Sequence, residues 1–161
     1  MRTTWAIKGQ TPYLRSSGSW KKLTMVGVMT TTPGGNRSKL FIRTIAGGQT
    51  ATEVIRFLED LKQHLHGKKL LLIWDGLPAH RSRSVAEYVK SQRAWLRTAR
   101  LPSYAPELNP IEYCWGAMKK KHLGNLRAEG MEKLGHAVRK AKRTMNDNKL
   151  LRGFLKASGL Y

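Results

Sequence analysis

The sequence predicts an α/β fold in which helices flank a mixed β-sheet. A strand–turn–strand pattern over residues 20–46 predicts a β-hairpin, and helical and strand patterns alternate after it. A hairpin supplies antiparallel pairing, whereas strands that are joined by helices pair in parallel. The predicted order is strand, strand, helix, strand, helix, strand, helix, and then a helical tail.

The N-terminal third of the chain carries the hairpin. Residues 5–8 resemble the end of a strand, and residues 9–12 (Gly-Gln-Thr-Pro) predict a turn. Strands rich in β-formers are predicted over 23–29 and 40–45. The segment 33–36, which reads Pro-Gly-Gly-Asn, is the turn signal between them.

A helix and a strand follow. Apolar residues at helical spacing predict an amphipathic helix over 51–65, with Thr50 or Thr52 as its cap. The run Leu70–Trp74 has no polar side chain, which predicts a strand that is buried on both faces in a parallel pair.

The next segment repeats the helix–strand pattern. A helix is predicted over 82–91, with Ser82 or Ser84 as its cap. A short strand over 95–101 follows, and a proline-rich loop covers 102–109.

Two helical regions complete the chain. One helix is predicted from Pro110 to about His122, and the basic segment 129–158 is predicted to be helical. We expect residues 1–125 to form the main domain and 126–161 to form a basic tail that packs on it or extends from it.

Charge limits the classes of function. The 161 residues include 30 Lys and Arg against 10 Asp and Glu, a net charge of +20. This excess predicts a polyanionic partner, nucleic acid before a membrane surface, although a solvated basic surface is the alternative. The single cysteine, Cys114, excludes an internal disulfide and a multi-cysteine zinc site, so a reducing compartment, the cytoplasm, is expected. No apolar run is long enough to span a bilayer.

Asp75 is the first candidate for chemistry. It directly follows the apolar strand Leu70–Trp74, and Gly76 and Pro78 break the strand pattern there. Sites in open α/β sheets form at the carboxyl ends of strands, and a carboxylate there is a ligand for a hard cation. The alternative is an aspartate that begins the turn into the next helix.

Glu112 is the second candidate. It occupies the first turn of the helix that Asn109 caps and Pro110 begins. There it can bind a metal, or it can reach back to the cap as in a capping box. Glu107 is a weaker rival, because it lies in the proline-rich loop.

His80 follows Asp75 within the same loop. It can hold a carboxylate or bind phosphate, and the alternative is an ordinary loop residue before a helix. Basic residues also form a cationic surface over the last third of the chain, for which a solvated helix face is the alternative: Lys119, Lys120, Lys121, Arg127, Lys133, Arg139, Lys140, Lys142, Arg143, Lys149, Arg152 and Lys156.

These residues resemble a known family. The chain resembles the DDE transposases of the mariner superfamily, and among them the bacterial insertion-sequence 630 group, over roughly residues 2–125. The segments that carry the resemblance are Trp5-Ala6, Lys8–Pro12, Trp74-Asp75-Gly76 with His80 and Ser82, Pro102–Glu112 with its Leu-Asn-Pro-Ile-Glu end, and Trp115 and Lys119.

The resemblance implies a ribonuclease H-like fold and a metal-dependent reaction on DNA. In this family three carboxylates hold two divalent ions, Mg²⁺ or Mn²⁺. Asp75 would be the second carboxylate and Glu112 the third, both as catalytic residues and as metal ligands. Two ions about 4 Å apart can activate the attacking oxygen and stabilise the leaving one.

The sequence departs from the family at its start. The family's first aspartate precedes the Trp-Ala segment on the central strand, but this chain has no acidic residue before Glu53, which lies in a predicted helix. We therefore expect an N-terminally truncated catalytic domain that lacks the central first strand and the helix-turn-helix region. It would be a frameshift half, a decayed copy or the product of a misassigned start.

Three functions are compatible with these features. The first is the transposase catalytic domain, inactive as a fragment, with transposon ends and target DNA as partners and a homodimer as the complete assembly. The second is a non-catalytic DNA-binding fragment or an inhibitor that pairs with full-length transposase or with an upstream-frame product. The third is a ribonuclease H-type enzyme that acts on RNA–DNA hybrids, against which the Asn-Pro-Ile-Glu segment argues.

Overall fold

The structure is a computed structural model that describes residues 7–10, 23–123 and 131–160. Its strands are β1 (Leu23–Thr31), β2 (Ser38–Ala46), β3 (Leu70–Trp74) and β4 (Leu96–Arg100). Its helices are α1 (Ala51–His64), α2 (Arg83–Ser91), α3 (Pro110–Met118), α4 (Met131–Met145) and α5 (Asn148–Ala157). Short helical turns cover Pro78–Arg81, Pro106–Leu108 and Lys119–Leu123.

Strands β1 and β2 form the predicted antiparallel hairpin. Their register runs from Leu23 opposite Ala46 to Thr31 opposite Ser38. In the turn, Gly35 has φ +68°, a conformation that glycine adopts without steric cost. The far edge of β2 is covered, because Asn146 and Asn148 accept hydrogen bonds from the backbone N–H groups of Leu40 and Ser38 at 2.8 and 2.7 Å.

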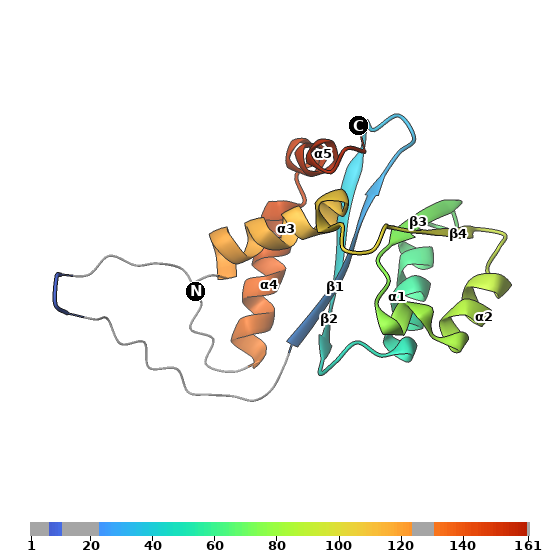
Figure 1. Ribbon diagram of the computed structural model, residues 1–161, viewed down its shortest axis with the longest axis horizontal. Helices are drawn as coiled ribbons and strands as arrows, with labels where there is room; N and C mark the ends of the chain where they lie inside the picture. Colours follow the sequence, from blue (N-terminus) through green and yellow to red (C-terminus); the bar gives the residue numbers. More distant parts are fainter. Residues whose placement is uncertain (1–6, 11–22, 124–130, 161) are drawn as a thin grey trace.

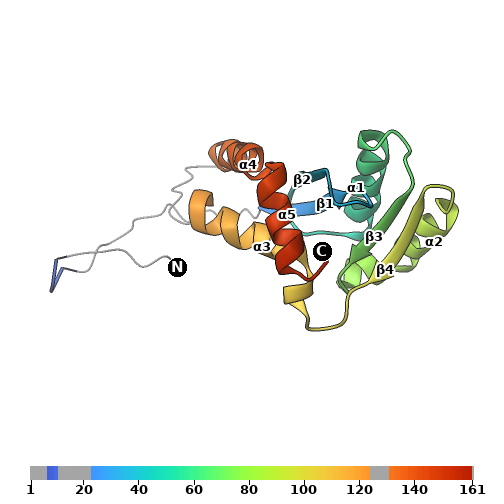
Figure 2. The ribbon, with the colours of Figure 1, turned by 90° about the horizontal axis from the view of Figure 1, so that it is seen from above.

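Helices pack against both faces of the hairpin (Figures 1 and 2). On one face Leu40 and Ile42 join a core with α3, α4 and α5. On the other face Phe41 packs on Phe57 of α1, with ring centroids 5.4 Å apart, and Arg43 forms an ion pair with Asp60 at 2.6 Å. Alternate residues of one strand thus serve two layers of helices.

Strands β3 and β4 form a parallel pair, from Leu70 opposite Leu96 to Trp74 opposite Arg100. Helix α2 connects them, and α1 and α2 bury one face of the pair in a second core around Leu58, Val85 and Leu96. Both kinds of pairing that the sequence predicts are therefore present. Within the described residues they form two separate two-stranded sheets.

The prediction that Leu70–Trp74 is buried on both faces is wrong. Leu72 is 6% exposed, but Leu71 is 61% exposed and Ile73 is 42% exposed. The reason is that helices cover one face of this two-stranded sheet, whereas Leu71 and Ile73 face an open cavity.

The predicted helix starts are confirmed. Thr50, rather than Thr52, caps α1, and Ser82, rather than Ser84, caps α2. The Asn109 side chain accepts a hydrogen bond from the N–H of Ile111 at the start of α3. In each case a side-chain oxygen satisfies a backbone donor that the first helical turn leaves free.

The C-terminal region is helical, but it is not continuous. Asn146 and Asp147 separate α4 from α5, and Asp147 caps α5 by accepting from the N–H of Leu150 at 2.8 Å. Both helices pack into the core around Cys114 and Met118 of α3. The division into residues 1–125 and 126–161 remains a prediction.

Two further outcomes concern the ends of predicted elements. Helix α3 ends at Met118, and residues 119–123 continue it as a wider helical turn rather than as regular α-helix. Of the predicted strand end and turn over 5–12, the structure describes residues 7–10, where Gly9 and the hydrogen bond from Gln10 N–H to the Ile7 carbonyl form a turn. The other residues of that prediction lie outside the described part.

Gly27 of β1 provides a test of the packing between the hairpin and α3. A Cβ at position 27 would lie 2.7 Å from the indole of Trp115, closer than such atoms approach. We expect Gly27→Ala to lower the free energy of unfolding by about 1–3 kcal/mol, because the indole must move. Urea unfolding measures this, with Gly48→Ala as the control, since a Cβ there meets nothing within 4 Å. An unchanged midpoint for Gly27→Ala would contradict the packing.

Cys114 provides a test of the core beneath α3. Its side chain is fully buried, and burial raises the pKa of its thiol from 9.0 to about 11. At pH 8 about one molecule in a thousand would carry the reactive thiolate. We therefore expect Ellman's reagent to label the native protein slowly at pH 8 and to label it rapidly in guanidinium chloride. Equal labelling rates in the two conditions would show that this core is open.

Candidate functional site

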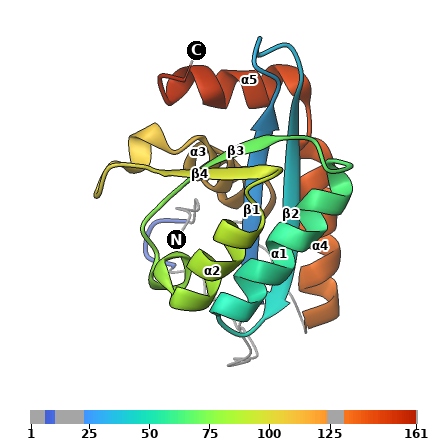
Figure 3. The same ribbon diagram turned by 90° about the vertical axis from the view of Figure 1, so that its right-hand side faces the viewer.

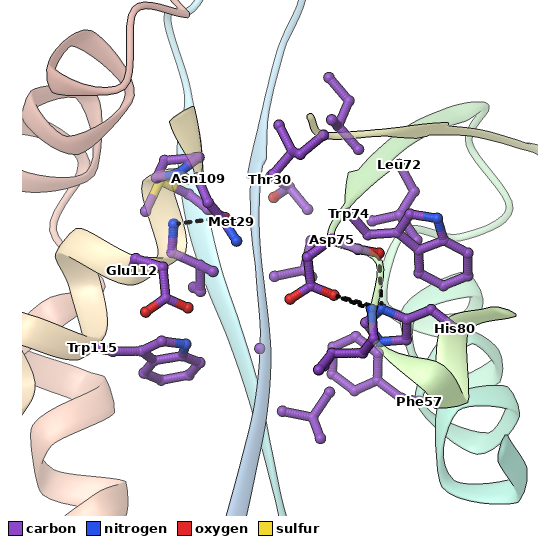
Figure 4. A pocket seen from close by; sticks show the side chains of 18 of the residues that line it. Met29, Thr30, Phe57, Leu72, Trp74, Asp75, His80, Asn109, Glu112 and Trp115 are labelled. Atoms are coloured by element: carbon purple, nitrogen blue, oxygen red, sulfur yellow. Dashed lines mark hydrogen bonds and ion pairs between the residues drawn. The ribbon is translucent and has the colours of Figure 1, made fainter. Parts of the chain in front are cut away.

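A cavity of about 300 Å³ lies between the hairpin, strand β3 and helix α3. Consecutive residues 25–31 of β1, residues 70–74 of β3 and the adjoining Asp75 line it, and α3 contributes its first two turns. Figure 4 shows this cavity with Glu112 and Trp115 on the α3 side and Asp75 and His80 on the β3 side. The cavity therefore joins segments from both of the packed layers.

Asp75 lies at the carboxyl end of β3, where the sequence places it. Its side chain is 44% exposed, and its Oδ1 atom accepts from the N–H of Leu77 at 3.2 Å and lies 2.9 Å from His80 Nδ1. The bond to Leu77 means that Asp75 also begins the turn, the alternative role that the sequence allows. Its second oxygen, Oδ2, has no hydrogen-bond or ion-pair partner among the described residues.

His80 is fixed on three sides. Its ring stacks on Trp74 at 4.6 Å and 9°, its Nδ1 atom lies beside Asp75, and its Nε2 atom lies 3.1 Å from the amide nitrogen of Gln49. If the Gln49 amide donates to Nε2, the neutral ring carries its proton on Nδ1 and donates it to Asp75. The sequence leaves His80 the choice of holding a carboxylate, binding phosphate or being an ordinary loop residue. Its contact with Asp75 corresponds to the first of these roles.

Gln49 is a residue that sequence reasoning missed. It lies in the loop between β2 and α1, directly before the helix cap Thr50. Its contact with His80 spans 31 positions of the chain, and no local pattern signals such a contact.

Glu112 projects from the first turn of α3. Its backbone N–H donates to the Asn109 carbonyl at 3.0 Å, but its carboxylate makes no hydrogen bond and no ion pair within the described residues. The reach-back of a capping box is therefore not formed there. Trp115, one turn later, packs its indole against Gly27 and so places this part of α3 on the hairpin.

The structure thus brings Asp75 and Glu112 to one cavity, from opposite sides (Figure 4). In that view strand β1 passes between them. Glu107, the rival, lies in the short turn Pro106–Leu108 and does not line the cavity. No group of three His, Cys, Asp or Glu side chains arranged to hold a metal is found in the part of the chain that the structure describes.

The electrostatic character of the cavity differs from that of the chain. Two carboxylates line it, and no lysine or arginine of the described residues does, although the sequence holds 30 of them. The rest of the lining consists mainly of apolar side chains from β1, β3 and α1. A carboxylate pair without a protein cation suits a positively charged ligand from solvent.

The basic residues of the last third are mostly exposed on α4, α5 and the turn 119–123. Lys142 is an exception, because its ammonium donates to the Ile42 carbonyl at 3.3 Å and lies 5.3 Å from the centre of the Phe41 ring. Lys142 therefore joins α4 to the hairpin rather than facing solvent. Arg127 lies outside the described residues.

Comparison with solved structures identifies the fold. The Mos1 mariner paired end complex with Mn matches at a TM-score of 0.71 and 18% identity, covering 99% of this chain and 48% of that one. The catalytic domain of Mos1 mariner transposase matches at a TM-score of 0.61 and 14% identity, covering 85% and 76%. This chain thus spans about half the length of the Mos1 chain in that complex, and its fold is ribonuclease H-like.

Comparisons of sequence give the family. No curated protein matches the chain significantly. No helix among the described residues has the length and apolar character needed to cross a membrane. The family model described as DDE superfamily endonuclease matches residues 1–135, and because this is most of its 161 residues, the chain belongs to the DDE superfamily endonucleases.

Proposed function

We propose that this chain is the catalytic domain of a DNA transposase of the insertion-sequence 630 group. In this proposal Asp75 and Glu112 bind divalent metal ions that serve DNA cleavage and strand transfer. The charge of the cavity carries the proposal: two carboxylates and no described lysine or arginine line it, in a chain of net charge +20.

The chemistry of the donors suits Mg²⁺ or Mn²⁺. Both are hard ions that bind carboxylate oxygens. Asp75 offers Oδ2 while Oδ1 is held by His80 and Leu77, and Glu112 offers both of its oxygens. The Mos1 catalytic domain has been solved with Mg and with Mn, which supports the same choice of metal for a chain of the same fold.

Each side chain has a defined role in this proposal. When bound, the ions activate the attacking oxygen and stabilise the leaving oxygen of a phosphodiester. Asp75 and Glu112 hold them from the two sides of the cavity. His80 donates to Asp75 and limits its rotation, so that Oδ2 stays directed away from the ring (Figure 4).

The partner in this proposal is DNA. Mos1 structures include a paired end complex with a left transposon end and a strand transfer complex. By analogy, transposon ends and target DNA are the substrates that we propose here, with a homodimer as the active assembly. The excess of cations over the chain supports binding to a polyanion.

A second candidate is a DNA-binding chain without catalytic activity, including one that pairs with full-length transposase. The observation that favours it is that no group of three His, Cys, Asp or Glu side chains able to hold a metal is found among the described residues, although Asp75, His80 and Glu112 all line the cavity. Two ligands hold an ion less tightly than three, so we expect weak metal binding and slow cleavage by this chain alone.

Metal binding distinguishes the two candidates. We expect Mn²⁺ to bind the purified chain in calorimetry, and Asp75→Asn and Glu112→Gln each to weaken binding by at least about tenfold, because each removes one charged ligand. Glu107→Gln is the matched control, since it removes the same charge from a loop outside the cavity. Equal affinity in all four proteins would exclude a metal site at Asp75 and Glu112.

Cleavage tests the reaction. With Mg²⁺ we expect weak nicking of supercoiled plasmid, abolished in both Asp75→Asn and Glu112→Gln and retained in Glu107→Gln. An RNA–DNA hybrid serves as a parallel substrate, and preferential cleavage of the hybrid would favour the ribonuclease H-type alternative. Robust nicking by the chain alone, lost in Asp75→Asn, would support the site and overturn the expectation of low activity.

A further inference from the structure

A second recess, of about 490 Å³, lies on the other side of α5 from the carboxylate cavity. One wall is the hairpin turn at Gly34 and Gly35. The other wall is the exposed face of α5, with Lys149, Arg152 and Lys156. Figure 3 shows α5 lying across the end of the hairpin. We call this recess the α5 groove.

The two walls of the α5 groove are joined by hydrogen bonds. Asn148, the first residue of α5, accepts from the N–H of Ser38 at 2.7 Å and donates to the carbonyl of Asn36 at 3.1 Å. A single side chain thus makes two hydrogen bonds where the turn enters β2 and places it against the start of α5. These hydrogen bonds therefore fix the two walls of the groove relative to each other.

The charges of the groove have one sign. Lys149, Arg152 and Lys156 are spaced at i, i+3 and i+7, which places them on one face of a helix. All three are exposed, and none has an ion-pair partner among the described residues. Leu151 and Leu155 on the opposite face enter the core. Like charges at this spacing repel, so the arrangement does not serve the stability of α5.

We propose that the α5 groove binds phosphates of the backbone of duplex DNA, outside the carboxylate cavity. This rests on the proposed function in that DNA is the substrate. Lysine and arginine bind phosphates without reading sequence, and the glycines of the turn admit a close approach. In the part of the chain that the structure describes, the lining has no large apolar side chain of the kind that docks into a protein partner or a lipid surface.

Helix α5 connects the groove with the carboxylate cavity. Leu155 lines the cavity, and its neighbour Lys156 lines the groove. A duplex held along the basic face of α5 is therefore held by an element that also forms a wall of the cavity. The groove positions DNA by its backbone and leaves the chemistry to the other site.

The salt dependence of binding tests the groove. Fluorescence anisotropy follows a labelled duplex of arbitrary sequence in EDTA, so that no metal contributes. The triple variant Lys149→Gln, Arg152→Gln, Lys156→Gln is expected to reduce the slope of log Kd against log salt by as much as about 2.7, since each phosphate contact contributes about 0.9. The control is Arg139→Gln, Lys140→Gln, Arg143→Gln on α4, which removes the same charge from exposed positions that do not line the groove. Equal slopes for the two triples would overturn the proposal, because net charge alone would then account for binding.

A substitution at Gly153 gives a second test that does not remove any cation. Gly153 lines the groove, and a Cβ there meets nothing within 4 Å. We expect Gly153→Glu to weaken binding of the duplex, because its carboxylate faces the phosphates, and Gly153→Ala to leave binding unchanged. Equal affinity of the two variants, with thermal unfolding confirming that both are folded, would overturn the proposal.

Two further measurements separate the groove from the metal site and DNA from a lipid surface. The duplex measurements are made in EDTA and the Mn²⁺ calorimetry is made without DNA, so a failure of the metal site leaves the groove supported, and a failure of the groove leaves the metal site standing. Vesicles that contain phosphatidylserine test the other source of phosphate. Vesicle binding that the α5 triple variant loses, while its DNA slope stays unchanged, would overturn the assignment to DNA.

Discussion

The arrangement of this chain depends on a hairpin against which helices pack on both faces. Leu40 and Ile42 pack against α3, α4 and α5, while Phe41 packs against α1 on the opposite face. The two faces alternate by one residue, so a shift of register by a single position would exchange them. The hairpin brings together a layer that carries Glu112 and a layer that carries Asp75. Its geometry therefore decides whether the two carboxylates share a cavity at all.

Close packing of side chains fixes the two elements that carry the carboxylates. Trp115 occupies the space that Gly27 leaves open on β1, which seats α3 on the hairpin one turn after Glu112. On the other side, the stacked pair of Trp74 and His80 holds Asp75. A histidine–carboxylate pair whose carboxylate is 44% exposed adds little to the free energy of folding. Its consequence is geometric: one oxygen of Asp75 is occupied, and the other is left available.

Local patterns predicted the elements well, because caps and periodicity are local. Thr50 and Asn109 cap helices where the sequence places them, and the position of Asp75 after a strand follows from the run that precedes it. The features that the sequence did not predict depend on contacts with distant parts of the chain. Periodicity cannot say what covers a strand, so the exposure of Leu71 was missed. Likewise Lys142 belongs to a charge run in the sequence, but its contact with the hairpin spans 100 positions.

The distribution of charge gives the two sites opposite characters. Three acidic side chains elsewhere in the described residues, Glu53, Asp60 and Glu87, form ion pairs with Arg43, Arg56 or Arg83. Among the described residues, Asp75 and Glu112 have no lysine or arginine beside them in the cavity, whereas the α5 groove has three cations and no acid. The phosphates of a DNA backbone would be attracted to the groove and repelled by bare carboxylates. Divalent cations between the carboxylates and a phosphate would remove that repulsion, so metal binding in the cavity and backbone binding in the groove support each other.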